Sequence, residues 1–197
     1  MKKILDDYKI KKEEILSKLK EFENNKDYFY EMCFCILTPQ SSAKVAWKCI
    51  LKLKELDFKN KNISPQSYIK QIRFYKNKSK YLLELKNNYN LIEKKIKGNN
   101  YPKELREFLV KNVKGYGYKE SSHFLRNTGH KDLAILDRHI LKNLKNYKVI
   151  KDIPNSLTPK KYCEIEDKFL NFSKKINIPI DHLDLLFWSQ ETGEIFK

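Results

Sequence analysis

The sequence contains few of the residues that interrupt helices. Of its 197 residues only five are glycine and six are proline, and it has no glycine- or serine-rich linker and no internal repeat. Alternation of apolar and polar residues, the pattern of a half-buried strand, does not extend over any convincing length. No apolar run approaches the ~18 residues that a membrane-spanning helix needs, and Asp6 and Asp7 interrupt the N-terminal segment before a secretion signal could form. We therefore expect a cytoplasmic protein without membrane spans.

Cysteine is also scarce. The four cysteines are Cys33, Cys35, Cys49 and Cys163, and none of them forms a CxxC pair or another spacing typical of metal ligands. A reducing compartment would keep them as thiols. We expect small apolar or helix-surface residues, and neither a metal site nor an iron–sulfur cluster.

Positive charge, by contrast, is abundant. Lysine and arginine number 41 against 25 acidic residues, which gives a net charge of +16 and a pI near 9.5. Such a surface favours a polyanionic partner, either nucleic acid or an anionic membrane surface. The alternative is a compositional bias towards lysine and asparagine that serves only to solvate the surface.

The apolar residues recur at helical spacing along nearly the whole chain. Capping residues and prolines mark where individual helices begin and end. Helices are predicted over residues 4–22, 28–37, 41 or 42 to 56, from 64–65, over 75–95, beyond 102, from 119, from 137, from 158–159, and over 180–189. The expected class is all-α, as one domain or as two small lobes that share one core.

Two of the five glycines, Gly115 and Gly117, lie between a helix that ends near Val113 and a helix that begins at Lys119. Glycine adopts the positive φ that a tight reversal requires. The exposed N–H groups of such a turn, together with the following helix N-terminus, suit a phosphate. This spacing is typical of a helix-hairpin-helix that grips a DNA backbone, although an ordinary corner between two helices remains the alternative.

The segment from Gly115 to His139 resembles the helix-hairpin-helix motif of the DNA glycosylase superfamily, with a lysine directly after the hairpin and an Asp-x-His about eighteen residues later. More narrowly, "GYKESSHFLRNTG" followed by "LAILDRHIL" is similar to the short, single-domain 8-oxoguanine DNA glycosylases first recognised as a second class in archaea. The likeness extends through "CILTPQSSA", "IRFYKNKSKYL" and "IDHLDLLFWSQETG". Lys114 replaces the proline of many members, and Tyr116 replaces a small branched apolar residue.

This resemblance implies one helical glycosylase domain over residues 1–197, with the hairpin motif at about 105–127 and the carboxylate helix from 137. It implies two small helical lobes with the active site between them. The lack of a four-cysteine cluster argues against the iron–sulfur branches, and the lysine argues against monofunctional relatives. The expected protein is a monomer that excises 8-oxoguanine from duplex DNA and cleaves the strand, without a redox cofactor or catalytic metal. A monovalent cation at the hairpin carbonyls is a further implication.

The resemblance assigns the Schiff-base nucleophile to Lys119 and the essential carboxylate to Asp137. A lysine amine can displace a base from C1′ and remain attached as an imine, but it attacks only when neutral. Burial, a helix N-terminus and nearby cations such as Lys114 favour the neutral form. Asp137 is predicted to cap the next helix and to stabilise positive charge on the sugar. Both residues could instead be structural, as a surface lysine and a simple N-cap.

The remaining site residues depend largely on the resemblance. The flipped base is expected between Phe74 and Trp188, with Tyr75 as the alternative to Phe74. The terminal carboxylate of Lys197, returned by a reversal at Gly193, is expected to accept from the guanine edge. The DNA contacts are assigned, beyond the hairpin glycines, to His139, to Arg73 near the orphaned base, and to Gln40, where Pro39-Gln40 is expected to open a helix. His123 is predicted to be a packing residue.

Two other functions remain open at the level of sequence. One is a glycosylase of the same fold that excises another oxidised base, such as an oxidised pyrimidine. The other is a non-catalytic DNA-binding module in which the hairpin holds phosphates and Lys119 is incidental. The presence of Lys119 and Asp137 at the spacing of the family favours an enzyme.

Overall fold

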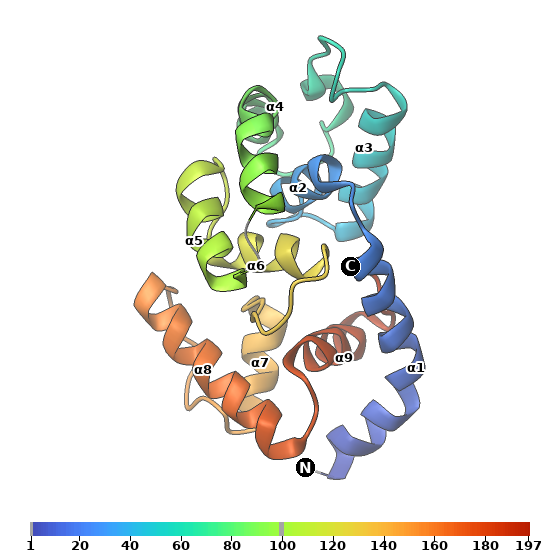
Figure 1. The fold of residues 1–197 in the computed structure, drawn as a ribbon. Helices are drawn as coiled ribbons and strands as arrows, with labels where there is room; N and C mark the ends of the chain where they lie inside the picture. The colour runs from blue at the N-terminus through green and yellow to red at the C-terminus, as the bar shows by residue number, and fades with distance from the viewer. Residues whose placement is uncertain (1, 99–100) are drawn as a thin grey trace. The chain divides into compact units, whose positions relative to one another are not determined.

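The computed structural model describes residues 2–98 and 101–197, and all regular elements among them are helical (Figure 1). The elements are α1 (Lys2–Asn24), α2 (Tyr28–Leu37), α3 (Ala43–Glu55), the 3₁₀ helix η1 (Pro65–Tyr68), α4 (Tyr75–Lys97), α5 (Pro102–Asn112), α6 (Tyr118–Arg126), α7 (Arg138–Asn146), α8 (Pro159–Ile176) and α9 (Ile180–Thr192). The predicted all-α class is confirmed. No described helix is both long enough and apolar enough to traverse a bilayer.

The chain divides into two compact units. The first comprises the segment up to Asn25 together with Leu125–Lys197, and the second comprises Lys26–Phe124. The boundary falls inside α6, whose first seven residues belong to the second unit. Each unit has a buried apolar core of its own.

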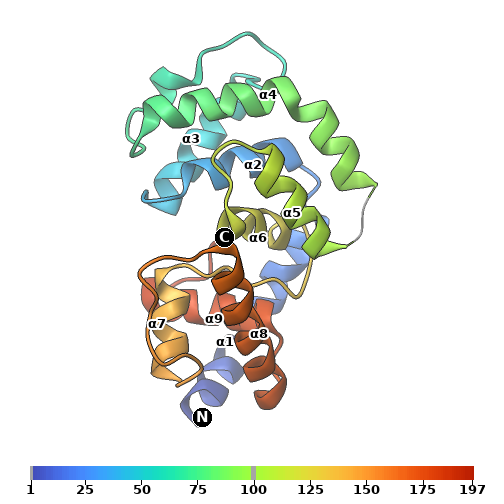
Figure 2. The ribbon, with the colours of Figure 1, turned by 90° about the vertical axis from the view of Figure 1, so that its left-hand side faces the viewer.

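The second unit is built around α2. Residues 29–37 of this helix are all buried, and α3 and α4 pack against it, with α4 lying across the unit in Figure 2. Aromatic rings fill the interface: Phe29 contacts Tyr89 edge-on at 5.0 Å, and Phe34 contacts Trp47 edge-on at 5.6 Å. A helix that is apolar on all sides is stable only in such a position, enclosed by others.

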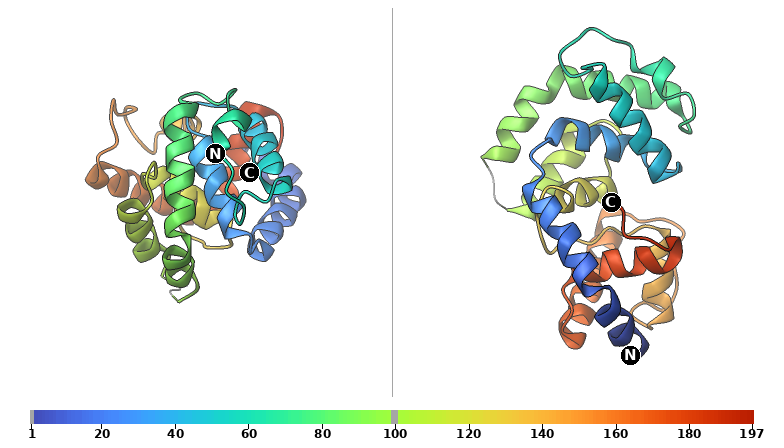
Figure 3. Two further views of the ribbon diagram at one scale, coloured as in Figure 1. Left: turned by 90° about the horizontal axis from the view of Figure 1, so that it is seen from above. Right: turned by 90° about the vertical axis from the view of Figure 1, so that its right-hand side faces the viewer.

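The first unit is organised around α9, which packs against α1, α7 and α8. The right-hand view of Figure 3 shows α9 next to α1 and steeply inclined to it. The ring of Phe187 stacks on Tyr147 at 5.5 Å and on Phe169 at 6.0 Å, which joins α9 to α8 and to the end of α7. Cys33, Cys35 and Cys49, in the second unit, are buried free thiols, while Cys163 in α8 is half-buried.

One predicted helix start was wrong. Pro39 and Gln40 do not open a helix but form the turn between α2 and α3, in which Gln40 adopts a left-handed conformation with φ of 56°. The helix starts only at Ala43, with Ser42 at its N-cap. Ser64 and Pro65 do start a helical element, with Ser64 at the N-cap, but it is the short 3₁₀ helix η1. Ile69 and Ile72 after it are buried before α4 begins. The other predicted starts agree with the structure to within two residues.

Candidate active site

The hairpin between α5 and α6 is tied to two other helices of the second unit. Gly115 has φ of 87°, and a Cβ atom at this position would lie 2.7 Å from Cδ2 of Tyr81 on α4. Both the conformation and the contact therefore require glycine here. Tyr116 is buried and its hydroxyl donates to the carbonyl of Met32 on α2 at 3.1 Å. Tyr116, a departure from the family pattern, thus anchors the hairpin to α2.

The second glycine leaves room for a carboxylate. The Gly117 N–H donates to Oε2 of Glu120 at 3.1 Å, and a Cβ on Gly117 would lie 3.2 Å from the same oxygen. Glu120 is the third residue of α6, so this bond is the glutamate half of a capping box. The Gly117 N–H, which the sequence analysis assigned to a DNA phosphate, therefore donates to the carboxylate of Glu120 instead.

Lys119 is the second residue of α6 and its side chain is 29% exposed. Its Nζ lies 3.2 Å from Oε1 of Glu120, the oxygen that does not cap the helix. Glu120 was not singled out from the sequence. Its signal was present, because a glutamate at the third position of a helix that begins after a glycine turn is a recognisable capping residue.

Lys78 on α4 is a second lysine of this region that the sequence analysis missed. It is buried, and its Nζ donates to the carbonyls of Leu37 at 2.8 Å and Pro39 at 2.7 Å, at the C-terminal end of α2. Burial, with a smaller contribution from the charge of Lys119, lowers the pKa of Lys78 to about 8, and Glu120 opposes the shift. The sequence signal is its position in register with the buried residues Leu82 and Leu85, where a solvated lysine is not expected.

In the first unit Asp137 is the N-cap of α7, as predicted. Its Oδ1 accepts from the backbone N–H groups of His139 and Ile140, both at 2.8 Å. Among the described residues, none donates a hydrogen bond to Oδ2. Oδ1 therefore caps the helix, and Oδ2 takes no part in the cap.

Two further carboxyl groups of α9 lie inside the first unit. Asp184 is buried and its Oδ2 lies 3.1 Å from Nη1 of Arg126, itself only 3% exposed. Burial raises the pKa of Asp184 to about 7, while Arg126 opposes the rise and Asp137 contributes to it. Burial also raises the pKa of Asp181 to about 6. The sequence signal for both was two aspartates spaced as i and i+3 within the apolar segment "IDHLDLLFW".

Two predicted site residues meet where α7 packs on α9. The imidazole of His139 contacts the ring of Trp188 edge-on, with centroids 5.3 Å apart. Nδ1 of His139 lies 3.6 Å from Oε2 of Glu191, and the other oxygen of Glu191, Oε1, pairs with Nζ of Lys142 at 3.0 Å. His139 therefore lies beside a carboxylate of its own unit. Trp188 is half-buried.

Phe74 occupies an unusual position. It is 53% exposed and has φ of 59°, a left-handed conformation that is rare for an aromatic residue, at the N-cap of α4. The guanidinium of Arg73 lies 4.9 Å from its ring centroid, and the Arg73 N–H donates to Oγ of Ser41 at 3.1 Å. Tyr75, the alternative, is half-buried. An exposed, conformationally constrained ring is suited to stack on a partner outside the fold.

The chain reverses at Gly193, as predicted, while the return of Lys197 towards Trp188 stays a prediction. Gly193 is the C-cap of α9 with φ of 84°, so the chain reverses there, and Ile195 beyond it is buried. Lys197 is half-buried. His123 is 8% exposed and contacts Phe34 edge-on at 5.7 Å, which confirms its predicted packing role.

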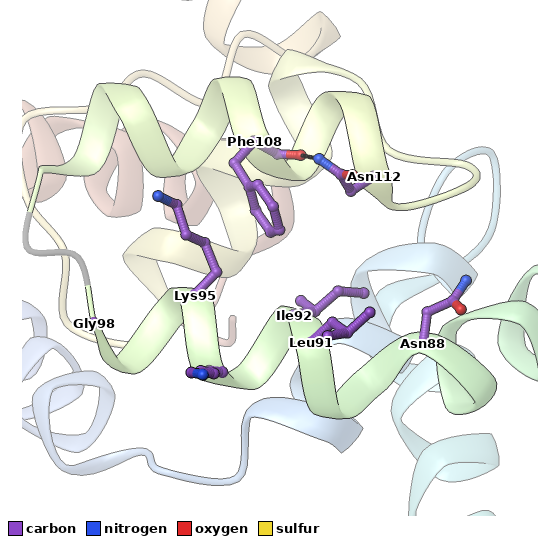
Figure 4. A pocket seen from close by; sticks show the side chains of 8 residues that line it. Asn88, Leu91, Ile92, Lys95, Gly98, Phe108 and Asn112 are labelled. Atoms are coloured by element: carbon purple, nitrogen blue, oxygen red, sulfur yellow. Dashed lines mark hydrogen bonds between the residues drawn. The ribbon is translucent and has the colours of Figure 1, made fainter.

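A separate cavity of about 660 Å³ lies between α4 and α5 (Figure 4). None of the predicted site residues lines it. Its lining contains no carboxyl, imidazole or thiol group and consists of Asn88, Leu91, Ile92, Lys94, Lys95, Gly98, Phe108 and Asn112. This cavity therefore does not carry the expected chemistry.

Comparison with known proteins identifies the family of this chain. The sequence model of the family described as Ogg-HhH, 8-oxoguanine DNA glycosylase, matches residues 10–178. The chain belongs to this family. A Fusobacterium nucleatum protein named 8-oxoguanine DNA glycosylase/AP lyase is 45% identical over 210 residues, which cover 96% of this chain and 94% of that protein. A Methanocaldococcus jannaschii protein of the same name is 37% identical, over 92% of this chain and 89% of its own length.

Solved structures agree with this membership of the Ogg-HhH family. The crystal structure of the M. jannaschii 8-oxoguanine glycosylase/lyase in complex with a 15-mer DNA containing 8-oxoguanine has a TM-score of 0.90 at 34% identity, covering both chains completely. The 8-oxoguanine DNA glycosylase of Thermotoga maritima has a TM-score of 0.89 at 28% identity, over all of this chain and 97% of the other.

Proposed function

We propose that this protein is a bifunctional DNA glycosylase and AP lyase that excises 8-oxoguanine from duplex DNA in base-excision repair. Membership of the family and the likeness to a relative solved with 8-oxoguanine DNA support the activity. The observation that carries the mechanism is Lys119, a partly exposed amine in the first turn of the helix that follows a glycine hairpin.

The reaction begins when the neutral amine of Lys119 attacks C1′ of the damaged nucleotide. The C1′–N bond to the base breaks and its electron pair leaves with the base, while a bond between Nζ and C1′ forms. Opening of the sugar ring converts this adduct into an imine. Loss of the C2′ proton then eliminates the 3′-phosphate, which is the lyase step.

Asp137 stabilises the positive charge that develops on the sugar as the base departs. The two bonds to Oδ1 keep its carboxylate oriented, and Oδ2 is left to face the sugar. A fixed charge directed at a developing opposite charge is the most effective form of electrostatic stabilisation, because it does not have to reorganise during the reaction.

The lesion is reached by base flipping. Phe74 and Trp188 are the aromatic residues assigned to contact with the extruded base, and the exposure and left-handed backbone of Phe74 support its role. The α-carboxylate of Lys197 accepts from the N1–H and N2–H₂ groups of guanine. Because oxidised and normal guanine share these donors, this contact selects guanine over other bases.

Duplex binding depends mainly on phosphate contacts. Gly115 and Gly117 give the hairpin its tight turn, and the net charge of +16 supplies the attraction to phosphates; the Gly117 N–H itself is bonded to Glu120. His139 adds a phosphate contact, while Arg73 and Gln40 lie on exposed loops that suit the orphaned base and the adjacent strand. The chemistry requires neither a redox cofactor nor a catalytic metal, and a monovalent cation at the hairpin would only shape the backbone.

Borohydride trapping tests this function. The wild-type protein should become covalently linked to a duplex that contains 8-oxoguanine, because only an imine is reduced to a stable amine. Lys119→Gln should bind the same duplex but leave no trapped product. Equal trapping by both proteins would remove Lys119 from the mechanism, and the absence of trapping by the wild type would refute the lyase assignment.

A further inference from the structure

The carboxylate of Glu120 makes two different contacts at the start of α6. Oε2 accepts from the Gly117 N–H at 3.1 Å, and Oε1 lies 3.2 Å from Nζ of Lys119. The side chain of Glu120 is only 14% exposed. Gly117 is what admits it, because a Cβ there would press on Oε2 at 3.2 Å.

Capping alone does not explain this arrangement. The cap uses one oxygen, and a glutamine, whose side-chain oxygen also accepts a hydrogen bond, serves equally well at the third position of a capping box. The second oxygen and the negative charge are directed at the amine of Lys119. A general base must lie within about 2.6–3.2 Å of the atom whose proton it takes, and Oε1 meets this condition.

We propose that Glu120 is a positioning residue for Lys119 which also accepts the proton that the amine loses during imine formation. This inference rests on the proposed function, in which Nζ is the attacking atom. Glu120 is suited to both tasks because the Gly117 N–H fixes the carboxylate on the same turn of helix that presents the amine.

Glu120 takes one proton from Nζ during this step and later gives it to O4′. Attack of neutral Nζ on C1′ produces a secondary ammonium, and one of its protons passes to Oε1 of Glu120. The nitrogen lone pair then forms the C=N bond as the C1′–O4′ bond breaks with its electron pair on O4′. The carboxylic acid of Glu120 returns its proton to O4′, which regenerates the carboxylate and leaves the protonated imine.

Glu120→Gln separates the two contacts, because the amide oxygen preserves the cap on Gly117 while the base is lost. In single-turnover trapping on an 8-oxoguanine duplex, this variant should form the imine about 10²-fold more slowly, the lower end of what general acid–base catalysis contributes. Its affinity for a duplex with an abasic-site analogue and its melting temperature should match the wild type. Glu107→Gln is the matched control, since Glu107 accepts from the Tyr118 hydroxyl at the same helix start and does not contact Lys119.

Chemical rescue distinguishes proton transfer from a structural effect. With Glu120→Ala, added formate should raise the rate of imine formation in proportion to its concentration, at an ionic strength held constant with chloride. Glu120→Gln, whose amide fills the site, should gain nothing from formate. Imine formation by Glu120→Gln at the wild-type rate, or an alanine variant that formate does not rescue, would overturn the role of Glu120. Because the wild type must trap in either case, its failure to trap would count against the proposed function instead.

Discussion

Oδ1 of Asp137 lies 2.8 Å from the backbone nitrogen of His139, and this bond, with its counterpart to Ile140, uses only one of the two carboxylate oxygens. Glu120 divides its oxygens in the same way, between the cap at Gly117 and the amine of Lys119. In each case a helix N-terminus fixes a carboxylate through one oxygen and leaves the second oxygen outside the cap. Backbone hydrogen bonds therefore set the orientation of both carboxylates.

Asp137→Asn should abolish most base removal while the fold remains intact. Asparagine caps a helix about as well as aspartate, so α7 should keep its start, but the negative charge opposite the sugar is lost. We expect a fall of about 10²-fold in single-turnover excision, with unchanged affinity for an abasic-site analogue. Asp137→Ala is the paired variant: it should lose a further ~1 kcal/mol of stability, the value of the cap. An asparagine variant with wild-type excision would reduce Asp137 to a helix cap.

Lys78 should make stability depend on pH. Its pKa in the folded protein is about 8, below the ordinary value of 10.5, so the unfolded chain binds more protons between these values and the free energy of unfolding rises with pH. From pH 7 to pH 9.5 this contribution amounts to about 2 kcal/mol. Urea unfolding should show the rise in the wild type and in the exposed-lysine control Lys80→Met, and it should be missing from Lys78→Met. An identical pH dependence in all three proteins would contradict the burial of Lys78.

Affinity for undamaged duplex should fall steeply with salt. Each phosphate that a lysine or arginine neutralises releases counterions, so the logarithm of the binding constant falls linearly with the logarithm of salt concentration. Lys114→Gln, in the exposed part of the hairpin, should lower the slope by about one. Lys168→Gln, an exposed lysine on α8, is the control and should leave the slope unchanged. A salt-independent affinity would exclude binding through phosphates.

The helices and the hairpin could be predicted from the sequence because their signals are local. Apolar spacing, prolines and capping residues located nearly every helix, and the cap at Asp137 followed from its place before a helical segment. Gly115 was explained by its conformation, but the sequence could not reveal that Tyr81 of α4 also excludes a side chain there. That contact joins residues distant in the chain, and no local pattern encodes it.

The buried charges were missed for the same reason. Lys78 was not singled out within the predicted helix over 75–95, yet it donates to carbonyls about forty positions earlier in the chain. The pair of Arg126 and Asp184 likewise joins α6 to α9 inside the first unit. In both cases a charged residue on an apolar helix face indicated burial, but the sequence did not identify the residue that pairs with it.

The C-terminal end provides the most specific test of base recognition. Gly193 reverses the chain after α9 and Ile195 is buried, so the last residues are held by the fold instead of fraying. If the α-carboxylate of Lys197 accepts from the guanine edge, a C-terminal tag should slow 8-oxoguanine excision at least tenfold while affinity for an abasic-site analogue, which lacks the base, stays the same.

Lys197→Ala retains the α-carboxylate and serves as the control, with excision near the wild-type rate. Deletion of Lys197 moves the carboxylate by one residue and should resemble the tagged protein. Excision by the tagged protein at the untagged rate would assign the guanine edge to other polar groups around Trp188.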